Sequence, residues 1–238
     1  MPAPIFLAQC ESTNEEILKF LNDSREVIQA VYTFNQTKGK GQYGNSWECA
    51  ENLNLAFTLA LPQQHSKTQD HLFNFRTAML LADFLAIMTK NAVEIKWPND
   101  IIIKNKKIAG ILTEKKTVLG VTYFIIGIGL NILQENFGHL PKAGSILTQT
   151  GLKLNPTDIA ESLFAYLTEH LRHEISAELI FENINRQLFR KEMVSVFETG
   201  GVRQNGIIKK VDEEGFLWVE LENEGLQKFY NKEIDLLY

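Results

Sequence analysis

Apolar and polar positions divide the chain into a long first part, where helices and strands alternate, and a short last part made of strands. Residues 72–90 carry apolar side chains at helical spacing and predict one long core helix. Shorter apolar stretches predict strands where they alternate with polar positions and helices where they repeat every three or four residues. We expect strands over 5–8, 27–35, 54–61, 101–103, 108–112 and 118–131, and further helices over 11–21, 155–173 and 177–190.

Two of the expected helices carry recognisable start signals. In the first, Ser12 is followed three residues later by Glu15, which is a capping box. The alternative is that the same small polar side chains receive a polar ligand at the helix N-terminus, but the pattern alone favours the cap. In the second, Asn155 precedes Pro156, and Asp158 follows in the first turn, as is typical of a helix start.

From Met193 onward the pattern changes. Short apolar segments over 194–197, 206–211, 216–221 and 227–230 are separated by Gly, Asn and Asp-Glu turns, and they predict a small all-β barrel. We therefore expect two domains, residues 1–192 and residues 193–238. Because short turns join the strands of the first domain, its fold class is α+β, with a mixed or antiparallel sheet and helices packed on it.

Composition limits the classes of protein and the cellular compartments that fit this chain. The chain has 238 residues, 45% of them hydrophobic and 22% charged, and its net charge of −5 gives no reason to expect DNA as a partner. Its two cysteines do not form a disulfide framework. The first residues lack the features of a signal peptide, and we expect no apolar run to be long enough for a membrane span. These features predict a cytoplasmic protein.

The segment 37–47 concentrates the candidate chemistry. It holds Gly39, Gly41 and Gly44 together with two lysines, and consecutive backbone N–H groups in such a loop form a nest for phosphate or carboxylate. The spacing also matches a dinucleotide fingerprint, and it lies one residue from a phosphate-binding P-loop. We reject both because no helical pattern follows and because Asn45 stands where the P-loop needs lysine.

Three segments together resemble the biotin–protein ligases, or biotin–[acetyl-CoA-carboxylase] ligases. They are Ser12-Thr13-Asn14, the glycine loop preceded by Gln36, and Lys96-Trp97-Pro98-Asn99-Asp100 with the following Lys107-Ile108-Ala109-Gly110-Ile111-Leu112. Residues 127–131, Gly-Ile-Gly-Leu-Asn, are similar to the next segment of that family. The resemblance covers nearly the whole chain. It implies a class II synthetase-like, biotin–lipoate ligase catalytic fold, with an SH3-like barrel at the C-terminus.

The resemblance also implies a reaction. Biotin attacks the α-phosphate of ATP to form biotinyl-5′-AMP, and the biotinyl group then passes to a lysine of a biotin carboxyl carrier protein. Two anions meet in the first step, so fixed cations and N–H donors are needed where negative charge gathers. Magnesium is expected to arrive bound to ATP, because the sequence contains no dedicated protein site for it.

Site residues follow from the same resemblance. Lys96 and Lys40 are implied as the catalytic cations, with Lys96 near the biotin carboxylate and the α-phosphate and Lys40 in a loop that folds over the adenylate. Residues implied to bind biotin are Ser12, Thr13, Asn14, Gln36, Lys40, Gly41, Gln42, Lys96, Gly110, Gly127 and Gly129. Residues implied to bind ATP are Gly39, Trp47, Asn99 and Asn131.

The glycine loop departs from the family's usual Gly-Arg-Gly-Arg-x-Gly-Arg. Lys40, Gln42 and Asn45 stand where that pattern has arginine. Arginine clamps phosphate through two parallel hydrogen bonds and lysine does not, so the sequence leaves open how firmly the loop retains the adenylate.

Two other functions stay open from the sequence. One is a lipoate or octanoate ligase of the same superfamily, and the other is a non-catalytic biotin-binding module. Many family members carry an N-terminal DNA-binding helix-turn-helix, and we expect none here because the Ser12 motif begins close to the first residue. A homodimer formed by pairing of sheets is possible, and the role of the C-terminal barrel is open.

Overall fold

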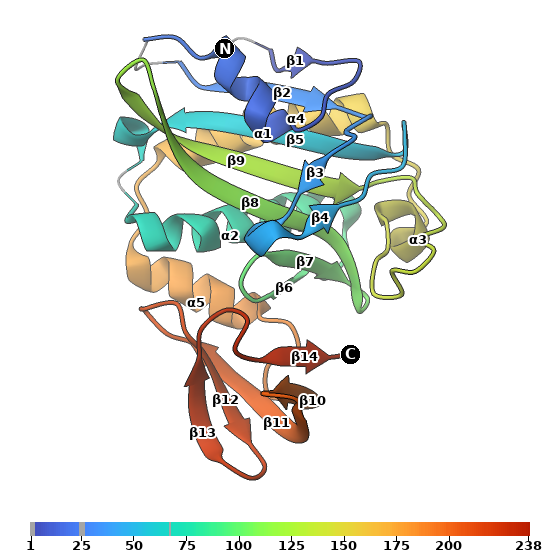
Figure 1. Ribbon diagram of the computed structural model, residues 1–238, viewed down its shortest axis with the longest axis vertical. Helices are drawn as coiled ribbons and strands as arrows, with labels where there is room; N and C mark the ends of the chain where they lie inside the picture. The colour runs from blue at the N-terminus through green and yellow to red at the C-terminus, as the bar shows by residue number, and fades with distance from the viewer. Residues whose placement is uncertain (1–2, 24–26, 67) are drawn as a thin grey trace.

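A seven-stranded mixed sheet forms the centre of the first lobe in the computed structural model, which describes residues 3–23, 27–66 and 68–238 (Figure 1). Its strand order is β1-β2-β5-β9-β8-β7-β6, with β1 parallel to β2 and the other neighbours antiparallel. The expected mixed sheet is therefore confirmed. The strands are β1 (Ile5–Phe6), β2 (Gln29–Thr33), β5 (Asn54–Pro62), β6 (Glu94–Lys96), β7 (Asp100–Ile103), β8 (Lys106–Val118) and β9 (Val121–Asn131).

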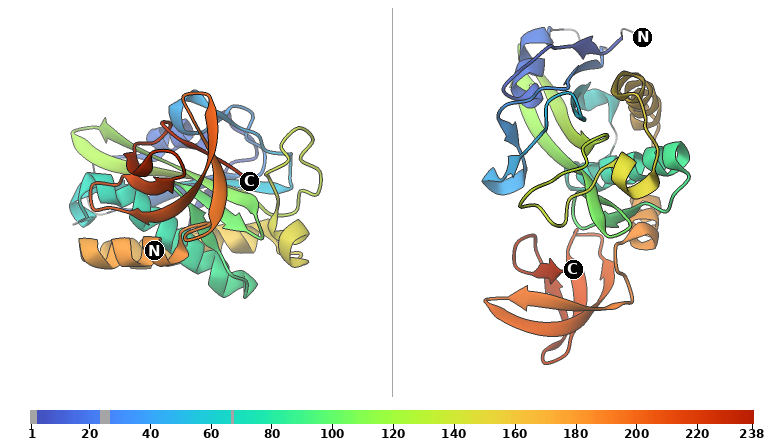
Figure 2. Two further views of the ribbon diagram at one scale, coloured as in Figure 1. Left: turned by 90° about the horizontal axis from the view of Figure 1, so that it is seen from below. Right: turned by 90° about the vertical axis from the view of Figure 1, so that its right-hand side faces the viewer.

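Helices cover one face of this sheet, and the N-terminal helix and the glycine loop lie on the other (Figure 2). The alternation along β9 explains the division: Ile126 and Ile128 pack into the main core with the helices, whereas Tyr123 and Ile125 pack with Ile17 on the opposite face. The helices are α1 (Thr13–Glu16), α2 (Asp70–Thr89), α3 (Ile146–Thr150), α4 (Pro156–Arg172) and α5 (Ala177–Gln187), with short 3₁₀ turns η1 (Ile17–Phe20), η2 (Gln42–Gly44) and η3 (Gln63–His65).

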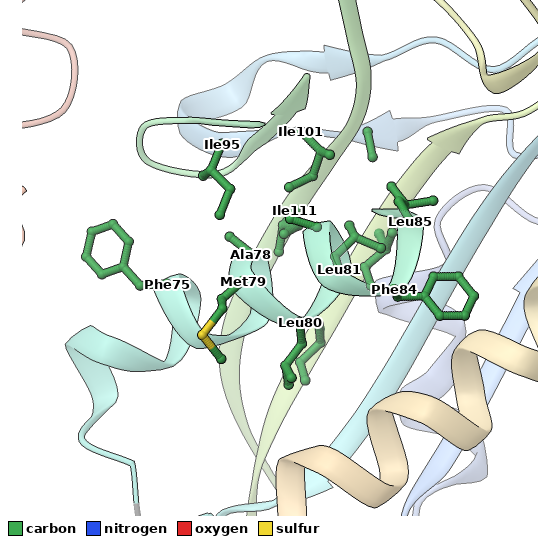
Figure 3. Close-up of a cluster of buried hydrophobic side chains, with 14 of the residues drawn as sticks. Phe75, Ala78, Met79, Leu80, Leu81, Phe84, Leu85, Ile95, Ile101 and Ile111 are labelled. Atoms are coloured by element: carbon green, nitrogen blue, oxygen red, sulfur yellow. The ribbon is translucent and has the colours of Figure 1, made fainter. Parts of the chain in front are cut away.

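Helix α2 lies in the core, and its side chains pack against Ile95, Ile101 and Ile111 of the sheet (Figure 3). By length and composition the stretch Leu72–Thr89, with mean hydropathy 1.4, meets the requirements of a membrane span, which corrects our expectation that no segment would. It is 72% buried inside the fold, as suits the core helix of a folded domain. The Phe73 and Phe124 rings stack against each other with centroids 3.9 Å apart.

The capping box at Ser12 is a wrong prediction. Within the described residues Ser12 makes no side-chain cap, although backbone N–H groups of Glu15 and Glu16 do bond to its carbonyl. Glu15 instead pairs with Lys40, so the box loses the side chain that would close it. The expected long helix is also interrupted, since α1 ends at Glu16 and continues as the 3₁₀ turn η1. Tertiary partners have overridden the local signal here.

Strand β8 is longer than expected. We predicted a strand over 108–112 and the next from 118, but β8 continues through the polar residues 113–117 and turns at Leu119 and Gly120, which have positive φ of 49° and 78°. Pairing with β9 from Val118↔Val121 onward stabilises this polar stretch as an extended hairpin.

A five-stranded antiparallel sheet forms the C-terminal lobe, in the order β13-β12-β11-β10-β14 (Figure 1). Two side chains of the first lobe fix it in place: Trp97 Nε1 donates to Gly215 O at 3.0 Å, and the Asn185 amide exchanges two hydrogen bonds with the Val211 backbone. The predicted segments are strands, and β14 is one that we missed. Their bounds are β10 (Val194–Thr199), β11 (Val202–Val211), β12 (Leu217–Leu221), β13 (Gly225–Phe229) and β14 (Asp235–Leu237).

Candidate active site

A cavity of about 470 Å³ opens on the sheet face that carries α1 and the glycine loop. Its walls come from α1, the glycine loop, the 96–100 turn, strands β8 and β9, and the C-terminal lobe. Gly39 and Asn131 are the only predicted site residues that do not line it. Those that do are Ser12, Thr13, Asn14, Gln36, Lys40, Gly41, Gln42, Trp47, Lys96, Asn99, Gly110, Gly127 and Gly129.

One end of the cavity is a cluster of hydroxyl and amide groups. Thr13 donates through its backbone N–H to Gln36 Oε1 at 2.8 Å, and its Oγ1 lies 2.8 Å from Thr58 Oγ1. Thr58 also donates to Asn14 Oδ1 at 2.7 Å, and Asn14 Nδ2 donates to Glu114 at 2.9 Å. These bonds fix the orientation of the Asn14 amide. The end therefore presents neutral donors and acceptors, suited to a polar uncharged group.

Thr58 and Glu114 were missed by the sequence reasoning. Thr58 is fully buried in β5, and Glu114 lies in the polar part of β8. A polar residue within the apolar run 54–61 was the available signal for Thr58. For Glu114 there was no signal, because its partner Asn14 is 100 positions away.

Two glycines of β9 make room for side chains that cross the sheet. A Cβ on Gly127 would lie 2.3 Å from Asn14 Oδ1, and a Cβ on Gly129 would lie 2.3 Å from Trp47 Cε2. Real Cβ atoms do not approach other atoms so closely, so both side chains depend on glycine beneath them. The alternation of β9 thus places Asn14 and Trp47 side by side along one strand.

The glycine loop is a small hairpin, β3 (Gly39–Lys40) and β4 (Ser46–Trp47), joined through η2. Gly39 is buried beneath its own partner strand, where a Cβ would meet Trp47 O at 2.3 Å and Gln36 Nε2 at 2.7 Å. This glycine shapes the hairpin from below the cavity. Trp47 Nε1 is buried next to Gly129 and has no acceptor among the described residues.

The lysines of the loop are paired with acids near α1. Lys38 lies 2.7 Å from Glu11, and Lys40 forms an ion pair and hydrogen bond with Glu15. The bond to Glu15 raises the pKa of Lys40, and the same bond lowers the pKa of Glu15. Because these groups are exposed, such pairs contribute little to stability and can exchange partners.

Lys96 lines the cavity from β6, which β7 and β8 separate from β9, so it lies at the other end from the polar cluster; it is partly buried. Desolvation lowers its pKa; the carboxylates of Asp100 and Asp235 oppose this shift, and the ammonium groups of Lys107 and Lys142 add to it. Its Nζ also lies 5.8 Å from the ring centre of Tyr238. An ammonium held among several charges at a cavity wall is a candidate binding site for an anion.

Lys107 is a second cation at this end that we did not single out, although it opens the Lys-x-Ala-Gly-Ile-Leu motif. It is 2.7 Å from Asp100 Oδ1 and lies over the Trp47 ring at 5.5 Å. The pair with Asp100 is largely buried, with side chains 33% and 17% exposed. The motif lysine thus stands between the 96–100 turn and the glycine loop.

Two predicted nucleotide residues make structural hydrogen bonds. Asn99 donates to Ile111 O at 2.6 Å, which ties the 96–100 turn to β8. Asn131 is buried and donates to Gly144 O at 2.9 Å. Asn131 lines a second cavity of about 820 Å³, which shares Ser46, Trp47 and Lys107 with the first. The two cavities therefore adjoin at Trp47.

The C-terminal lobe contributes to the first cavity, a role the sequence left open. Asn231, Lys232, Ile234, Asp235 and Leu236 all line it. These residues lie in β14 or in the turn just before it, and β14 is the strand that the apolar pattern failed to reveal.

Comparison with known proteins identifies the family of this chain. The model of the Biotin/lipoate A/B protein ligase family matches residues 6–131. The biotin–[acetyl-CoA-carboxylase] ligase of Paracoccus denitrificans is 28% identical over 225 residues, which is 89% of this chain and 91% of that protein. The biotin protein ligase of Aquifex aeolicus, solved with biotin and ATP, shares the fold with a TM-score of 0.79 at 22% identity, covering 100% of this chain and 99% of the other.

A third similar structure is the biotin protein ligase of Leishmania major in complex with biotinyl-5-AMP. It has a TM-score of 0.65 at 25% identity and covers 97% of this chain and 99% of that one. The family match spans the segments that build the cavity from Ser12 to Gly129. This chain belongs to the biotin/lipoate A/B protein ligase family.

Proposed function

We propose that the protein is an ATP-dependent biotin–protein ligase. It joins the carboxylate of biotin to the α-phosphate of ATP, releasing pyrophosphate, and then transfers the biotinyl group from AMP to a lysine of a biotin carboxyl carrier protein. One observation carries the proposal: a single cavity has a neutral polar cluster at one end and two partly buried lysines, Lys96 and Lys107, at the other. That division fits a ligand with a neutral ring at one end and a carboxylate at the other.

The neutral end suits the ureido ring of biotin, which offers two N–H donors and a carbonyl acceptor. Asn14 and Gln36 present amides, and Ser12 and Thr13 present hydroxyl groups, with Thr58 and Glu114 holding the Asn14 amide in place. Such a preorganised polar cluster discriminates strongly against a ligand that lacks matching groups. A lipoyl ring has no hydrogen-bonding pair of this kind, and this favours biotin over lipoate.

The charged end suits the first chemical step. Biotin carboxylate and the α-phosphate repel each other, and a fixed ammonium between them lowers the barrier as charge gathers on the phosphoryl oxygens. Lys96 fills this role in our proposal. Lys107 lies between Asp100 and the Trp47 ring, next to the proposed nucleotide position, and its ammonium group assists on the phosphate side. Desolvation around Lys96 strengthens its attraction for both anions.

The nucleotide lies, in this proposal, beside Trp47, where the two cavities adjoin. Trp47 offers a ring face there, Asn99 and Asn131 complete the nucleotide side, and Gly39 shapes the loop beneath it. Among the described residues no cluster of three or more His, Cys, Asp or Glu side chains forms a metal site. Mg²⁺ therefore enters with ATP and is held chiefly by its phosphates.

The glycine loop closes over the intermediate and excludes water in the same scheme, with Lys40 exchanging Glu15 for the adenylate.

We further propose that residues 1–192 form the catalytic domain and residues 193–238 a separate C-terminal domain, and that the enzyme works in the cytoplasm. Size-exclusion chromatography with light scattering tests whether the chain forms a homodimer, which the sequence left open.

The decisive assay is ATP–pyrophosphate exchange. We expect exchange that depends on biotin and not on lipoate or octanoate, and a product of the mass of biotinyl-AMP. Exchange with lipoate alone would identify a lipoate ligase, and thermal stabilisation by biotin without exchange would identify a binding module. Full exchange activity in Lys96→Ala would remove Lys96 from its assigned role.

A further inference from the structure

The glycine loop touches the C-terminal lobe at two neighbouring positions. Asn231 Nδ2 donates to Gln42 Oε1 at 3.3 Å, and Lys232 Nζ lies 4.9 Å from the centre of the Tyr43 ring. Gln42 and Asn231 are 189 positions apart in the chain. All four residues line the first cavity, so the contacts lie at its rim.

Backbone geometry supports the contact between Tyr43 and Lys232. Tyr43 and Lys232 have positive φ of 56° and 75°, which is uncommon for residues other than glycine. Such conformations are costly and persist where the surroundings hold them. Here each strained residue presents its side chain to the other. Tyr43 is 57% exposed, so its ring is not held by core packing and the lysine is the cation stacked on it.

The C-terminal side of the contact is a fixed turn. Glu233 accepts from Tyr230 N at 2.7 Å and its own N–H bonds to Tyr230 O at 3.1 Å, while Ile234 is buried directly after it. The lobe itself is anchored through Trp97 and Asn185. The turn 230–233 is therefore closed by its own hydrogen bonds and leads into a buried residue, and the glycine-rich loop is the part that it can steady.

We propose that the turn 230–233 is a clasp that holds the glycine loop over the reaction intermediate, with Asn231 and Lys232 as positioning residues. The proposal rests on the proposed function and adds to it the retention of biotinyl-AMP. The loop is tethered on the α1 side by the exposed pairs Lys38–Glu11 and Lys40–Glu15. The clasp tethers the opposite side, at Gln42 and Tyr43, where the loop has no arginine to grip phosphate.

The test measures how fast the adenylate leaves. Enzyme loaded with biotin and ATP is desalted, and dissociation of radiolabelled biotinyl-AMP is followed in wild type, Asn231→Ala, Lys232→Met and Lys232→Arg. We expect about two- to fivefold faster loss in Asn231→Ala and Lys232→Met, from one hydrogen bond or one cation–π contact. Lys232→Arg keeps the cation over the ring and should release the adenylate at the wild-type rate.

Lys228→Met is the matched control. Lys228 also lies over an aromatic ring, Phe216 at 4.6 Å, on the same lobe, but neither residue lines the cavity. It should leave adenylate release unchanged. Equal acceleration by Lys228→Met and Lys232→Met would show a general effect on the lobe and overturn the clasp.

A second readout needs no activity. Trypsin cleavage after Lys38 and Lys40 reports how often the loop opens, and Lys232→Met should raise the rate of that cleavage about two- to fivefold at unchanged melting temperature. In a Tyr43→Leu background, Lys232→Met should add nothing further. Wild type that forms no adenylate would refute the proposed function, while an unchanged cleavage rate in Lys232→Met would refute the clasp independently.

Discussion

The glycines of β9 give the sharpest test of how the site is built. In Gly127→Ala the new methyl group would lie 2.3 Å from Asn14 Oδ1 and 2.9 Å from its Cγ, so the buried amide has to move. Moving it breaks the bond from Thr58 at 2.7 Å and the bond to Glu114 at 2.9 Å. Backbone φ is not the obstacle, because Gly127 is not among the positive-φ glycines.

Two net hydrogen bonds of about 1 kcal/mol each, plus the cost of displacing a buried amide, give a destabilisation of about 2–4 kcal/mol, although Thr58 keeps Thr13 as a partner. For a chain of this size that lowers Tm by about 4–16 °C. If Asn14 also binds the ureido group, its displacement should raise the KM for biotin about tenfold or more, since each 1.4 kcal/mol is tenfold. The KM for ATP should change much less.

Gly129→Ala is the comparison, because its methyl group would meet Trp47 Cε2 at 2.3 Å and leave Asn14 alone. It should raise the KM for ATP and spare that for biotin. Differential scanning fluorimetry measures the Tm of each variant. Pyrophosphate exchange, titrated with one substrate at a time, measures the KM for biotin and the KM for ATP. Adding Asn14→Ser to Gly127→Ala should recover stability by relieving the clash. Identical KM profiles for the two alanine variants would refute the separation of the two substrates along β9.

Three further outcomes are expected. Lys96→Met should cut pyrophosphate exchange by about 100-fold or more, yet raise the free energy of unfolding at neutral pH. Because burial lowers the pKa of Lys96, its charge destabilises the folded protein below the folded pKa, and this cost fades as pH rises toward 10.5. The difference in free energy of unfolding between the variant and wild type should therefore shrink in urea titrations at alkaline pH. Trp97→Phe removes the bond to Gly215 O and should lower the free energy of unfolding by about 1–2 kcal/mol in urea titrations, without changing the far-UV spectrum. Burial raises the pKa of Cys49 to about 11, so iodoacetamide at pH 8 should label it slowly in folded protein and rapidly in urea; fast labelling of folded protein would contradict this.

Local patterns predicted those parts of the fold that depend on local physics. The start of α4 is an example: Asn155 accepts from Thr157 N at 2.9 Å, and Pro156 follows at the first position. The apolar run 54–61 forms β5, buried on both faces. In such segments near neighbours determine the outcome, so a sequence window contains the necessary information.

Long-range partners explain what the patterns missed. Glu15 has the spacing of a capping residue, yet its carboxylate accepts a hydrogen bond from Lys40, which is 25 positions away. The short strand β14 has little apolar signal of its own and exists because it pairs with β10. In the site, the motifs located Asn14 and Lys96, but the side chains that orient or crowd them, Glu114 and Lys107, are identified only once the sheet brings them together.

The arrangement also explains why motifs that look unrelated in the sequence occur together. Strand β9 lies next to both β5 and β8, so glycines at alternate positions open one face of the sheet without disturbing the isoleucines that fill the core on the other. Asn14 takes the first opening and Trp47 the second. A register slip of one residue would turn the isoleucines toward the cavity and close both. In the proposed function, the pleat of β9 therefore sets the separation between the biotin end and the nucleotide end, and the loops close over a site that the sheet already defines.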